Sequence, residues 1–344
     1  MAVILTVRSP DGDYQIVIER GVARRVAEFS AHPRVAVTTN TTIAPLHAQT
    51  VLDALPTARL VTMPDGEQYK TLATVEALYH GYVQAGLDRH GAVLALGGGV
   101  VGDTAGFGAA TYYRGVDLIQ MPTSLLAMVD SSVGGKVGVD LPEGKNLVGA
   151  FKQPTVVLID TDFLATLPEV EWRCGMAEVV KAGLIGDPAI LDPSLWTSTR
   201  AEDLIRRAVQ VKIDIVEADP FEKGVRAYLN LGHTFAHALE TVTHYGWRHG
   251  EAVGLGLVAA AHLSAGLGMC DTSLPEQVEA WVRQVGLPTR LGDVSADTLW
   301  DAMATDKKWR AGRSRFVLMH GPQHVTVVED VPRSAVLEAL DKVS

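Results

Sequence analysis

The pattern of strand-like and helix-like segments changes near residue 160, and this change limits the possible folds more than any other feature of the chain. Before it, short runs of β-branched and aliphatic residues alternate with helical patterns, which is typical of a parallel sheet covered by helices. Those runs cover residues 34–38, 58–63, 92–96, 116–121 and 155–159. After it, helical patterns dominate and cover residues 172–185, 201–217, 231–243, 251–267 and 276–285. The sequence therefore predicts an α/β domain over residues 1–160 and a mainly helical domain over residues 161–344.

Two hairpins are expected beside these elements. Residues 3–7 and 14–19 flank Asp11-Gly12, a dipeptide that favours a tight turn between strands. Residues 315–318 and 325–328 flank Gly321-Pro322 in the same way. The first hairpin belongs to the expected α/β domain, and the second is the main exception to the helical character of the second domain.

The composition is that of a folded protein whose partner is not nucleic acid. Of the 344 residues, 47% are hydrophobic and 20% are charged, which is typical of a globular chain. The formal charge of −10 argues against nucleic acid, because binding a phosphate backbone requires a basic surface. A local group of cations can still hold a small anionic substrate. With only Cys174 and Cys270, a disulfide-based fold is excluded, and the reducing cytoplasm is the expected compartment.

Two apolar segments raise the question of a membrane or a targeting signal. Residues 1–7 are too few for a signal peptide and lack a basic leader. Residues 252–270 contain no Asp, Glu, Lys or Arg, but His262, Ser264 and four glycines interrupt them. We expect this segment to be a buried core helix rather than a membrane span, so no membrane partner is expected.

A glycine-rich turn follows the strand-like run 92–96. Gly97, Gly99 and Gly102 satisfy the GxGxxG pattern, which lets backbone amides approach a pyrophosphate at a helix N-terminus. A Rossmann site also needs an acid at the end of the next strand, and Asp117 has the right spacing but opens its strand. Two interpretations stay open: a tight connection without a ligand, and a Rossmann-like nucleotide site that departs from the strict pattern.

The segment 131–146 resembles a phosphate-binding loop only in part. Its Gly-Gly-Lys ends at Lys136, but Asp130 stands where the first glycine is needed, and Val137 replaces the Ser or Thr that would hold magnesium. The remaining segment is rich in glycine and also carries Lys145 and Asn146. It suits either an anion pocket or a plain surface loop.

Histidines in the second half suggest a metal centre. His233 and His237 are four residues apart, so both imidazoles face one side of a helix. Thr234 excludes the HExxH metalloprotease pattern. His249 opens the next apolar helix, and Glu178 lies on an earlier one. These residues suit a catalytic zinc site with two His and one carboxylate, and structural histidines are the alternative.

Cations and an amide lie near these histidines in the sequence. Arg226, Asn230 and His233 follow one another at spacings of four and three, which predicts one helical face. Lys212 lies on the preceding helix, and Lys181 is one turn from the expected metal-binding carboxylate. Such a face suits an acidic, polyhydroxylated substrate, and an ordinary solvated helix face is the alternative.

Several motifs in the same order resemble the 3-dehydroquinate synthase family of the sugar phosphate cyclase superfamily, over nearly the whole chain. In the expected α/β domain they cover residues 64–70, 97–103, 121–136 and 144–149. In the expected helical domain they cover residues 175–181, 229–237, 249–253 and 306–308. Several motifs in order are far more specific than any one glycine-rich turn.

This resemblance implies an NAD- and metal-dependent phosphorus–oxygen lyase that converts 3-deoxy-D-arabino-heptulosonate 7-phosphate into 3-dehydroquinate and phosphate. The reaction belongs to the shikimate pathway, which leads to chorismate and the aromatic amino acids. It would proceed by oxidation with NAD, phosphate elimination, reduction and intramolecular aldol closure. Zinc or cobalt would act as the Lewis acid, and the cleft between the two domains is the expected place for the reaction.

The resemblance also assigns roles to individual residues. The metal ligands would be Glu178, His233 and His249. Catalytic roles would fall to Asp130, Lys181, Glu222 and His237, the last two in proton transfer. Substrate would be bound by Arg114, Lys136, Asn146, Lys212, Arg226 and Asn230, together with Lys307 or Lys308. NAD would be bound by Asp65, Gly66, Glu67, Gln68, Tyr69, Lys70, Gly99, Val100, Val101, Gly102, Asp103, Thr123, Ser124, Lys136, Lys145, Phe163, Leu164, Ala165 and Thr166.

Two other functions stay open. A sister cyclase such as 2-deoxy-scyllo-inosose synthase would accept a neutral sugar phosphate, but Lys212 and Arg226 suit a substrate carboxylate. A metal-dependent polyol dehydrogenase would release NADH, but Lys136 and Asn146 suit a phosphate. Whether the substrate phosphate or His237 acts as the base also stays open. The expected partners are a small-molecule sugar phosphate and a second copy of the chain in a homodimer.

Overall fold

The computed structural model describes residues 2–244, 246–304 and 314–344 and divides into two compact units, Met1–Pro168 and Glu169–Ser344. The division falls after residue 168 rather than at the expected residue 160. The 3-10 helix Thr161–Thr166 explains the difference, because it is attached to the first unit. Asp160, which caps this helix, also accepts hydrogen bonds from the backbone of Gly21 and Ala23.

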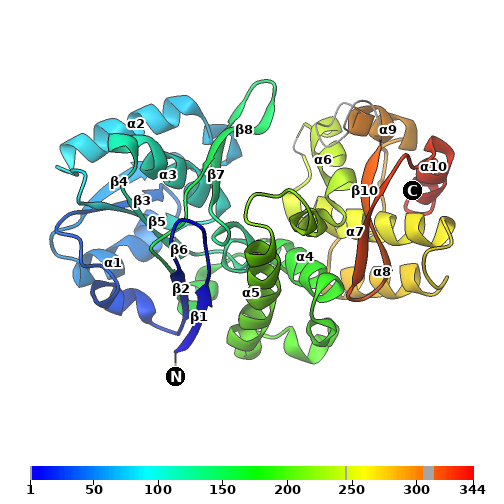
Figure 1. Cartoon of the computed structure of the whole chain (residues 1–344), viewed down its shortest axis with the longest axis horizontal. Helices are drawn as coiled ribbons and strands as arrows, with labels where there is room; N and C mark the ends of the chain where they lie inside the picture. Colours follow the sequence, from blue (N-terminus) through cyan, green and yellow to red (C-terminus); the bar gives the residue numbers. More distant parts are fainter. Residues whose placement is uncertain (1, 245, 305–313) are drawn as a thin grey trace. The chain divides into compact units, whose positions relative to one another are not determined.

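The first unit is built around a seven-stranded sheet with the order β1-β2-β9-β6-β5-β3-β4 (Figure 1). Neighbouring strands are parallel except β1 and β2, which form the predicted hairpin. The strands are β1 Val3–Val7, β2 Tyr14–Ile18, β3 Val35–Asn40, β4 Arg59–Met63, β5 Ala92–Gly97, β6 Asp117–Pro122 and β9 Val156–Ile159. Each of the five predicted parallel runs overlaps one of these strands, to within two residues at either end. The α/β prediction is therefore confirmed.

Helices and a second hairpin cover this sheet. The helices are α1 Gln49–Ala54, α2 Leu72–Gln84 and α3 Gly99–Thr111, and the hairpin strands are β7 Lys136–Leu141 and β8 Gly144–Phe151. Thr71 caps α2, because its Oγ1 accepts the backbone N–H of Thr74. Buried residues of α2, α3 and β7 form one apolar core with β3, β4, β5 and β6. The hairpin β7–β8 was not predicted, since this segment was expected to be an anion-binding or surface loop.

The second unit consists mainly of helices, as predicted (Figure 1). They are α4 Glu169–Ile185, α5 Ala201–Ala218, α6 His233–Val242, α7 His249–Gly266, α8 Leu274–Val285, α9 Ala296–Ala304 and α10 Arg333–Asp341. The predicted late hairpin is present as β10 Arg315–Gly321 and β11 His324–Glu329. The last two helices, α9 and α10, were not predicted.

Helix α7 is the buried helix expected from the apolar run 252–270. It is apolar on all sides, and a helix of this kind must be surrounded by other elements. Nearly all of its residues from Gly250 to Ser264 are buried, and it packs against α4, α6, α8 and α10. Within the described part of the chain, no helix is both long and apolar enough to cross a membrane.

Candidate active site

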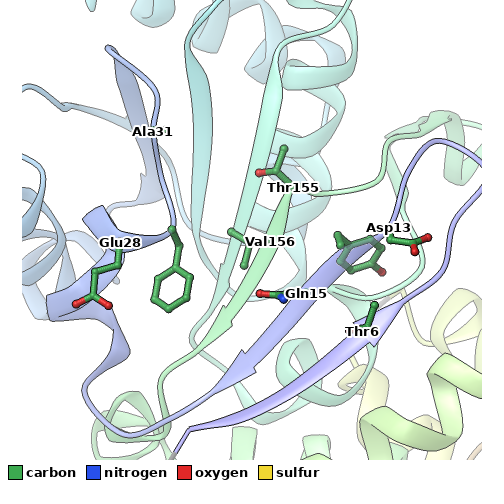
Figure 2. A pocket seen from close by; sticks show the side chains of 9 residues that line it. Thr6, Asp13, Gln15, Glu28, Ala31, Thr155 and Val156 are labelled. Carbon is green, nitrogen blue, oxygen red and sulfur yellow. The ribbon is translucent and has the colours of Figure 1, made fainter.

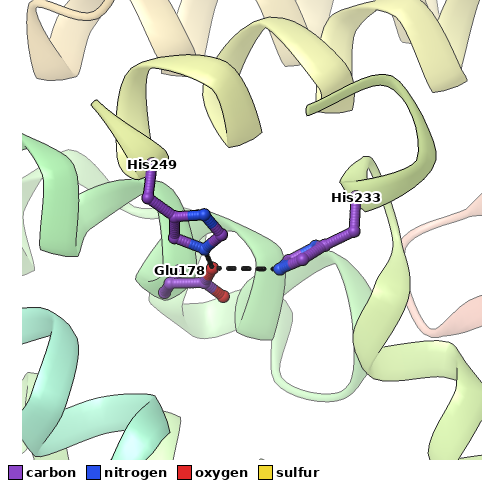
Figure 3. Close-up of side chains that lie close together, drawn as sticks. All are labelled: Glu178, His233 and His249. Carbon is purple, nitrogen blue, oxygen red and sulfur yellow. Dashed lines mark ion pairs between the residues drawn. The ribbon is translucent and has the colours of Figure 1, made fainter. Parts of the chain in front are cut away.

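Glu178, His233 and His249 meet in the second unit and form a candidate metal centre (Figure 3). Glu178 lies in the middle of α4, while His233 and His249 are the first residues of α6 and α7. Nε2 of His233 lies 3.5 Å from Oε1 of Glu178, and Nε2 of His249 lies 3.4 Å from the same oxygen. Tetrahedral zinc with bonds of about 2.1 Å holds its ligand atoms roughly 3.4 Å apart. Both imidazole nitrogens therefore lie at the spacing of zinc ligands from the carboxylate, and one ligand atom from each of the three side chains lies within 4.8 Å of the others.

Two glycines of α7 allow the three helices to approach this closely. A Cβ atom on Gly250 would overlap the backbone of Cys174, one turn before Glu178 on α4. A Cβ atom on Gly256 would overlap the carbonyl group of Gly232, which precedes α6. A side chain at either position would push α7 away from its neighbour. These approaches bring the first residues of α6 and α7 to the carboxylate.

The second nitrogen of each imidazole faces another group. Nδ1 of His233 lies 3.2 Å from the carbonyl oxygen of Leu231, and Nδ1 of His249 lies 3.5 Å from Oε1 of the buried Glu240. Such partners fix the tautomer that leaves Nε2 able to bind a metal. Burial lowers the pKa of His249, but the carboxylates of Glu178 and Glu240 outweigh burial and raise it to about 9. Metal binding at Nε2 would have to displace that proton.

The surroundings of Glu178 also suit a cation. Glu178 is only 2% exposed, and neither of its carboxylate oxygens has a hydrogen-bond donor of good geometry. Lys181, one turn along α4, forms an ion pair with Oε2. His237 stands beside the centre, with its ring 5.5 Å from that of His233 and 6.4 Å from that of His249. A buried carboxylate among imidazoles fits a divalent metal, because burying a charge requires a compensating one.

The loop between α5 and α6 carries three predicted site residues, Glu222, Arg226 and Asn230. The carboxylate of Asp219 accepts hydrogen bonds from three backbone N–H groups of this loop, including that of Arg226. Burial raises the pKa of Asp219, but these hydrogen bonds outweigh burial and hold it below its usual value. Arg226 is 2% exposed and donates from Nη1 to the carbonyl oxygen of Pro220 at 2.6 Å. Asn230 donates from Nδ2 to Oε1 of Glu222 at 3.2 Å.

The prediction that Arg226, Asn230 and His233 share one helical face is wrong. Val225–Asn230 forms a separate 3-10 helix. The chain then turns before α6, because Leu231 leaves helical geometry and Gly232 has a left-handed backbone with φ of 77°. Arg226 and Asn230 therefore belong to a different element from His233, the candidate metal ligand.

The predicted cations of the second unit are buried. Lys181, Lys212 and Arg226 are 3%, 9% and 2% exposed, respectively. A protein buries cations only where anionic or polar groups face them. Lys181 meets such a group in the carboxylate of Glu178, and Arg226 meets one in the carbonyl oxygen of Pro220.

Apart from Lys136 and Lys145, which lie in the hairpin β7–β8, the predicted NAD-binding residues of the first unit follow the carboxyl ends of four parallel strands. Residues 65–70 follow β4, 99–103 follow β5, 123–124 follow β6, and 163–166 follow β9. Ligands of open α/β sheets bind at this edge. Helix α3 begins there, and its N-cap residue Gly98 provides no side-chain hydrogen bond. The N–H groups of its first turn have no partner within the helix, and such groups can bind a phosphate.

A charged network at this edge joins predicted NAD-binding and substrate-binding residues. Lys70 is 4% exposed and donates from Nζ to Oδ2 of Asp103 and to Oδ1 of Asn146, both at 2.6 Å. Lys145 lies 3.4 Å from Oε1 of Glu67. Burial lowers the pKa of Lys70, but the nearby carboxylates outweigh burial and raise it. Lys70 therefore stays charged at this edge.

Arg114 lies elsewhere in the first unit. It follows α3, whose 13 residues run over about 20 Å from the edge that carries the predicted NAD-binding segments toward the opposite edge. Tyr113 and Arg114 have left-handed backbones with φ of 52° and 67°, and the arginine side chain is exposed. Lys136 is also exposed and begins β7, while Asp130 is half-buried in the turn before it. The structure therefore separates Arg114 from the network around Lys70.

A shallow cavity of about 520 Å³ lies at the other edge of the sheet (Figure 2). It is found where β2 and β9 begin, away from the predicted NAD-binding segments. Its lining residues are Thr6, Asp13, Tyr14, Gln15, Glu28, Phe29, Ala31, Thr155 and Val156. None of them is a predicted site residue, so this cavity is not the candidate active site.

Sequence comparisons identify the family. The family model described as 3-dehydroquinate synthase N-terminal matches residues 60–174, and the corresponding C-terminal model matches residues 175–309. The chain belongs to the 3-dehydroquinate synthase family. A 3-dehydroquinate synthase from Halorhodospira halophila is 46% identical over 338 residues, which cover 94% of this chain and 93% of that relative.

Solved structures confirm the fold of this member of the 3-dehydroquinate synthase family. A 2-epi-5-epi-valiolone synthase from Streptomyces hygroscopicus, solved with NAD⁺ and Zn²⁺ bound, is 27% identical. It covers 96% of both chains with a TM-score of 0.88. A 2-deoxy-scyllo-inosose synthase is 23% identical, covers 99% of this chain and 100% of its own, and has a TM-score of 0.91. The predicted fold class is thus confirmed.

The structure brings two polar residues to the candidate site, Glu240 and Asp219, that the sequence analysis of this 3-dehydroquinate synthase family member did not indicate. Glu240 is seven residues after His233 and shares its helical face, so the helical period could have indicated it. Asp219 precedes a proline at the end of α5, which is a signal for a turn but not for its partners. The expected substrate lysine, Lys307 or Lys308, lies outside the described residues.

Proposed function

We propose that this chain converts 3-deoxy-D-arabino-heptulosonate 7-phosphate into 3-dehydroquinate and phosphate, with NAD and a divalent metal as cofactors. The observation that carries the proposal is the 46% identity, over 94% of the chain, to a 3-dehydroquinate synthase. The spacing of the candidate metal ligands in the second unit adds support. The solved 2-epi-5-epi-valiolone synthase shares the fold at 27% identity, well below the 46% identity to the 3-dehydroquinate synthase.

In this proposal, Glu178, His233 and His249 hold zinc or cobalt. When bound, the metal supplies Lewis-acid polarisation of a substrate hydroxyl or carbonyl oxygen. Glu240 orients His249 through Nδ1, at 3.5 Å. His237 is beside the metal centre and Glu222 is in the loop before it, so each is proposed to hold or move a proton of the substrate.

The first unit is proposed to bind NAD, which supplies a hydride acceptor that later returns the hydride. Backbone N–H groups in the first turn of α3 are proposed to meet the pyrophosphate, assisted by Lys70 and Lys145. Asp65 is proposed to accept hydrogen bonds from a ribose, because it is a carboxylate at the end of a parallel strand. Asn40 and Thr42 fix its two oxygens, each at 2.6 Å.

The substrate is proposed to be held through its two anionic ends. Lys136 and Asn146 would bind the phosphate, because an ammonium and an amide both donate to anionic oxygens. Lys212 and Arg226 would bind the carboxylate, for which the planar guanidinium provides two parallel donors. Asn230, Asp130 and Lys181 complete the proposed contacts with the substrate.

Arg114 leads us to propose a homodimer. Its position after α3, away from the edge that carries Lys70 and Asn146, makes it unsuited to the phosphate bound by its own unit. An exposed arginine on a strained turn can instead serve the site of a second copy. We expect sedimentation analysis to give twice the chain mass of 36.8 kDa. A mass of one chain would contradict this role for Arg114.

The redox balance of the reaction tests the proposed function. In a cyclase cycle the hydride taken from the substrate is returned, so NAD is needed only in catalytic amounts. We expect the released phosphate to exceed the bound NAD many times over, with no steady increase in NADH absorbance. The measurement is an assay of phosphate and NADH in parallel, with the heptulosonate phosphate as substrate.

A polyol dehydrogenase would give a different result in the same assay, because it would accumulate one NADH for each turnover. Accumulation of NADH in proportion to turnover would refute the cyclase function, as would the absence of phosphate release. A sugar phosphate that lacks a carboxylate serves as the control substrate. Faster turnover of that substrate would indicate a sister cyclase instead.

A further inference from the structure

The hairpin β7–β8 has an irregular register beside the predicted substrate-binding residue Asn146. Val139 pairs with Val148, and Leu141 pairs with Gly144, so the ladder is interrupted between these pairs. The first strand contributes only Asp140 to the gap, whereas the second strand contributes residues 145–147. Bulges of this kind redirect side chains and occur often next to active sites.

The carboxylate of Asp140 closes this gap. Its Oδ1 accepts the backbone N–H of Asn146 at 2.7 Å, in place of a ladder hydrogen bond. The backbone N–H of Asp140 donates to the carbonyl oxygen of Lys70 at 2.8 Å. Asn146 has a left-handed backbone with φ of 53°, a conformation that asparagine adopts more readily than most residues with a side chain. The hydrogen bond to Asp140 holds the backbone N–H of Asn146 in this conformation.

The side chain of Asn146 is oriented from the other direction by Lys70. The ammonium group has donors and no acceptor, so it can meet only the carbonyl end of the amide. The contact at 2.6 Å therefore pins Oδ1 of Asn146 toward Lys70 and turns the Nδ2 donors away from it. Asn146 is exposed, so these donors are available to a ligand. An amide that presents only donors selects an anion.

We propose that Asp140 is a positioning residue that, together with Lys70, holds Asn146 with its amide donors directed at the phosphate of the substrate. This inference rests on the proposed function, in which Asn146 binds that phosphate. Asp140 itself is not assigned a contact with the substrate. Its carboxylate would on its own repel an anion, so its presence beside an anion site is explained by the backbone that it holds.

Inorganic phosphate, measured as an inhibitor and by calorimetry on the NAD- and zinc-loaded enzyme, tests this inference. We expect Asp140→Ala to weaken phosphate binding and raise KM for the substrate by roughly tenfold each, with a smaller change in kcat. A factor of ten corresponds to about 1.4 kcal/mol, close to the value of one hydrogen bond to a charged group. Asp140→Asn should restore most of the affinity, because its amide oxygen can still accept the Asn146 N–H.

A matched control separates position from charge. Glu143→Ala, in the turn of the same hairpin, also removes one negative charge and should leave phosphate binding unchanged or slightly stronger. If charge alone mattered, Asp140→Ala would strengthen phosphate binding as well, and that result would overturn the inference. In an Asn146→Ala background, Asp140→Ala should have no further effect, and an equal loss there would also overturn it.

The design also separates this inference from the proposed function. Calorimetry with inorganic phosphate needs no turnover, so it reports on Asp140 even if the heptulosonate phosphate is not a substrate. Absence of turnover in the wild-type enzyme would count against the proposed function alone. An active wild-type enzyme with unchanged phosphate affinity in Asp140→Ala would count against the positioning role alone.

Discussion

Replacing Glu178 by glutamine is expected to remove the metal and reduce phosphate release by about a thousandfold or more. Glutamine keeps the shape of the side chain but loses the charge that a divalent cation requires. Lewis-acid stabilisation of a transition state contributes several kcal/mol, and about 4 kcal/mol corresponds to a thousandfold. The change also leaves Lys181, 3% exposed, without the carboxylate that it now contacts. The measurements are the zinc content of the purified variant and its rate of phosphate release.

The control for this prediction lies on the same helix. Glu169 is in the first turn of α4, where its exposed carboxylate contacts Arg173. Glu169→Gln should therefore keep full zinc content and activity. Treating the wild-type enzyme with a chelator should abolish turnover, and zinc or cobalt should restore it. Full activity in Glu178→Gln, or in thoroughly demetallated enzyme, would show that the three side chains do not form the catalytic metal centre.

The centre of the sheet could be predicted from sequence because its inner strands are buried on both faces, unlike the edge strands β1 and β4. Such strands appear as continuous apolar runs. Every residue of Ala92–Gly97 in β5 is buried, and the same is true of Val156–Ile159 in β9. The prediction depends only on local composition and on the alternation with helices. It therefore did not need any knowledge of which strands pair.

The hairpin β7–β8 could not be predicted in the same way. Gly138 and Gly149 face each other across it, and glycine has a low preference for strands. Its position is set instead by packing on α3, where Val137 lies against Gly106. A strand that is stabilised by distant contacts leaves little local pattern. The residues of the bulge, which carry the inferred positioning role, belong to this part of the fold.

The metal centre was partly predictable. The spacing of His233 and His237 indicates a shared helical face from local geometry alone. The convergence with Glu178 is a tertiary feature, because it depends on the close approach of Gly250 to Cys174. The resemblance to a family supplied that ligand set, whereas spacing alone left structural histidines as an alternative. Local spacing also gave the wrong helical face for Arg226 and Asn230, because Gly232 interrupts the helical pattern before His233.

The loop that contains this break carries the second large prediction, which concerns Arg226. Replacing Arg226 by alanine is expected to reduce kcat/KM for the carboxylate-bearing substrate by about 30-fold to about 5,000-fold. This range corresponds to the roughly 2–5 kcal/mol lost when one partner of a buried charge pair is truncated. Turnover of a sugar phosphate that lacks a carboxylate should change far less, because this substrate presents no such group to the guanidinium.

The ratio of the two substrates is the decisive measurement, because Arg226 is 2% exposed and its loss also disturbs packing. A packing defect would lower both activities equally, whereas loss of carboxylate recognition lowers only one. Arg226→Lys should be intermediate, since an ammonium keeps the charge but not the paired donors. Lys223→Ala removes an exposed cation from the same loop and should leave the ratio unchanged. If Arg226→Ala preserved the discrimination against sugar phosphates that lack a carboxylate, the substrate carboxylate would have to be bound by other residues.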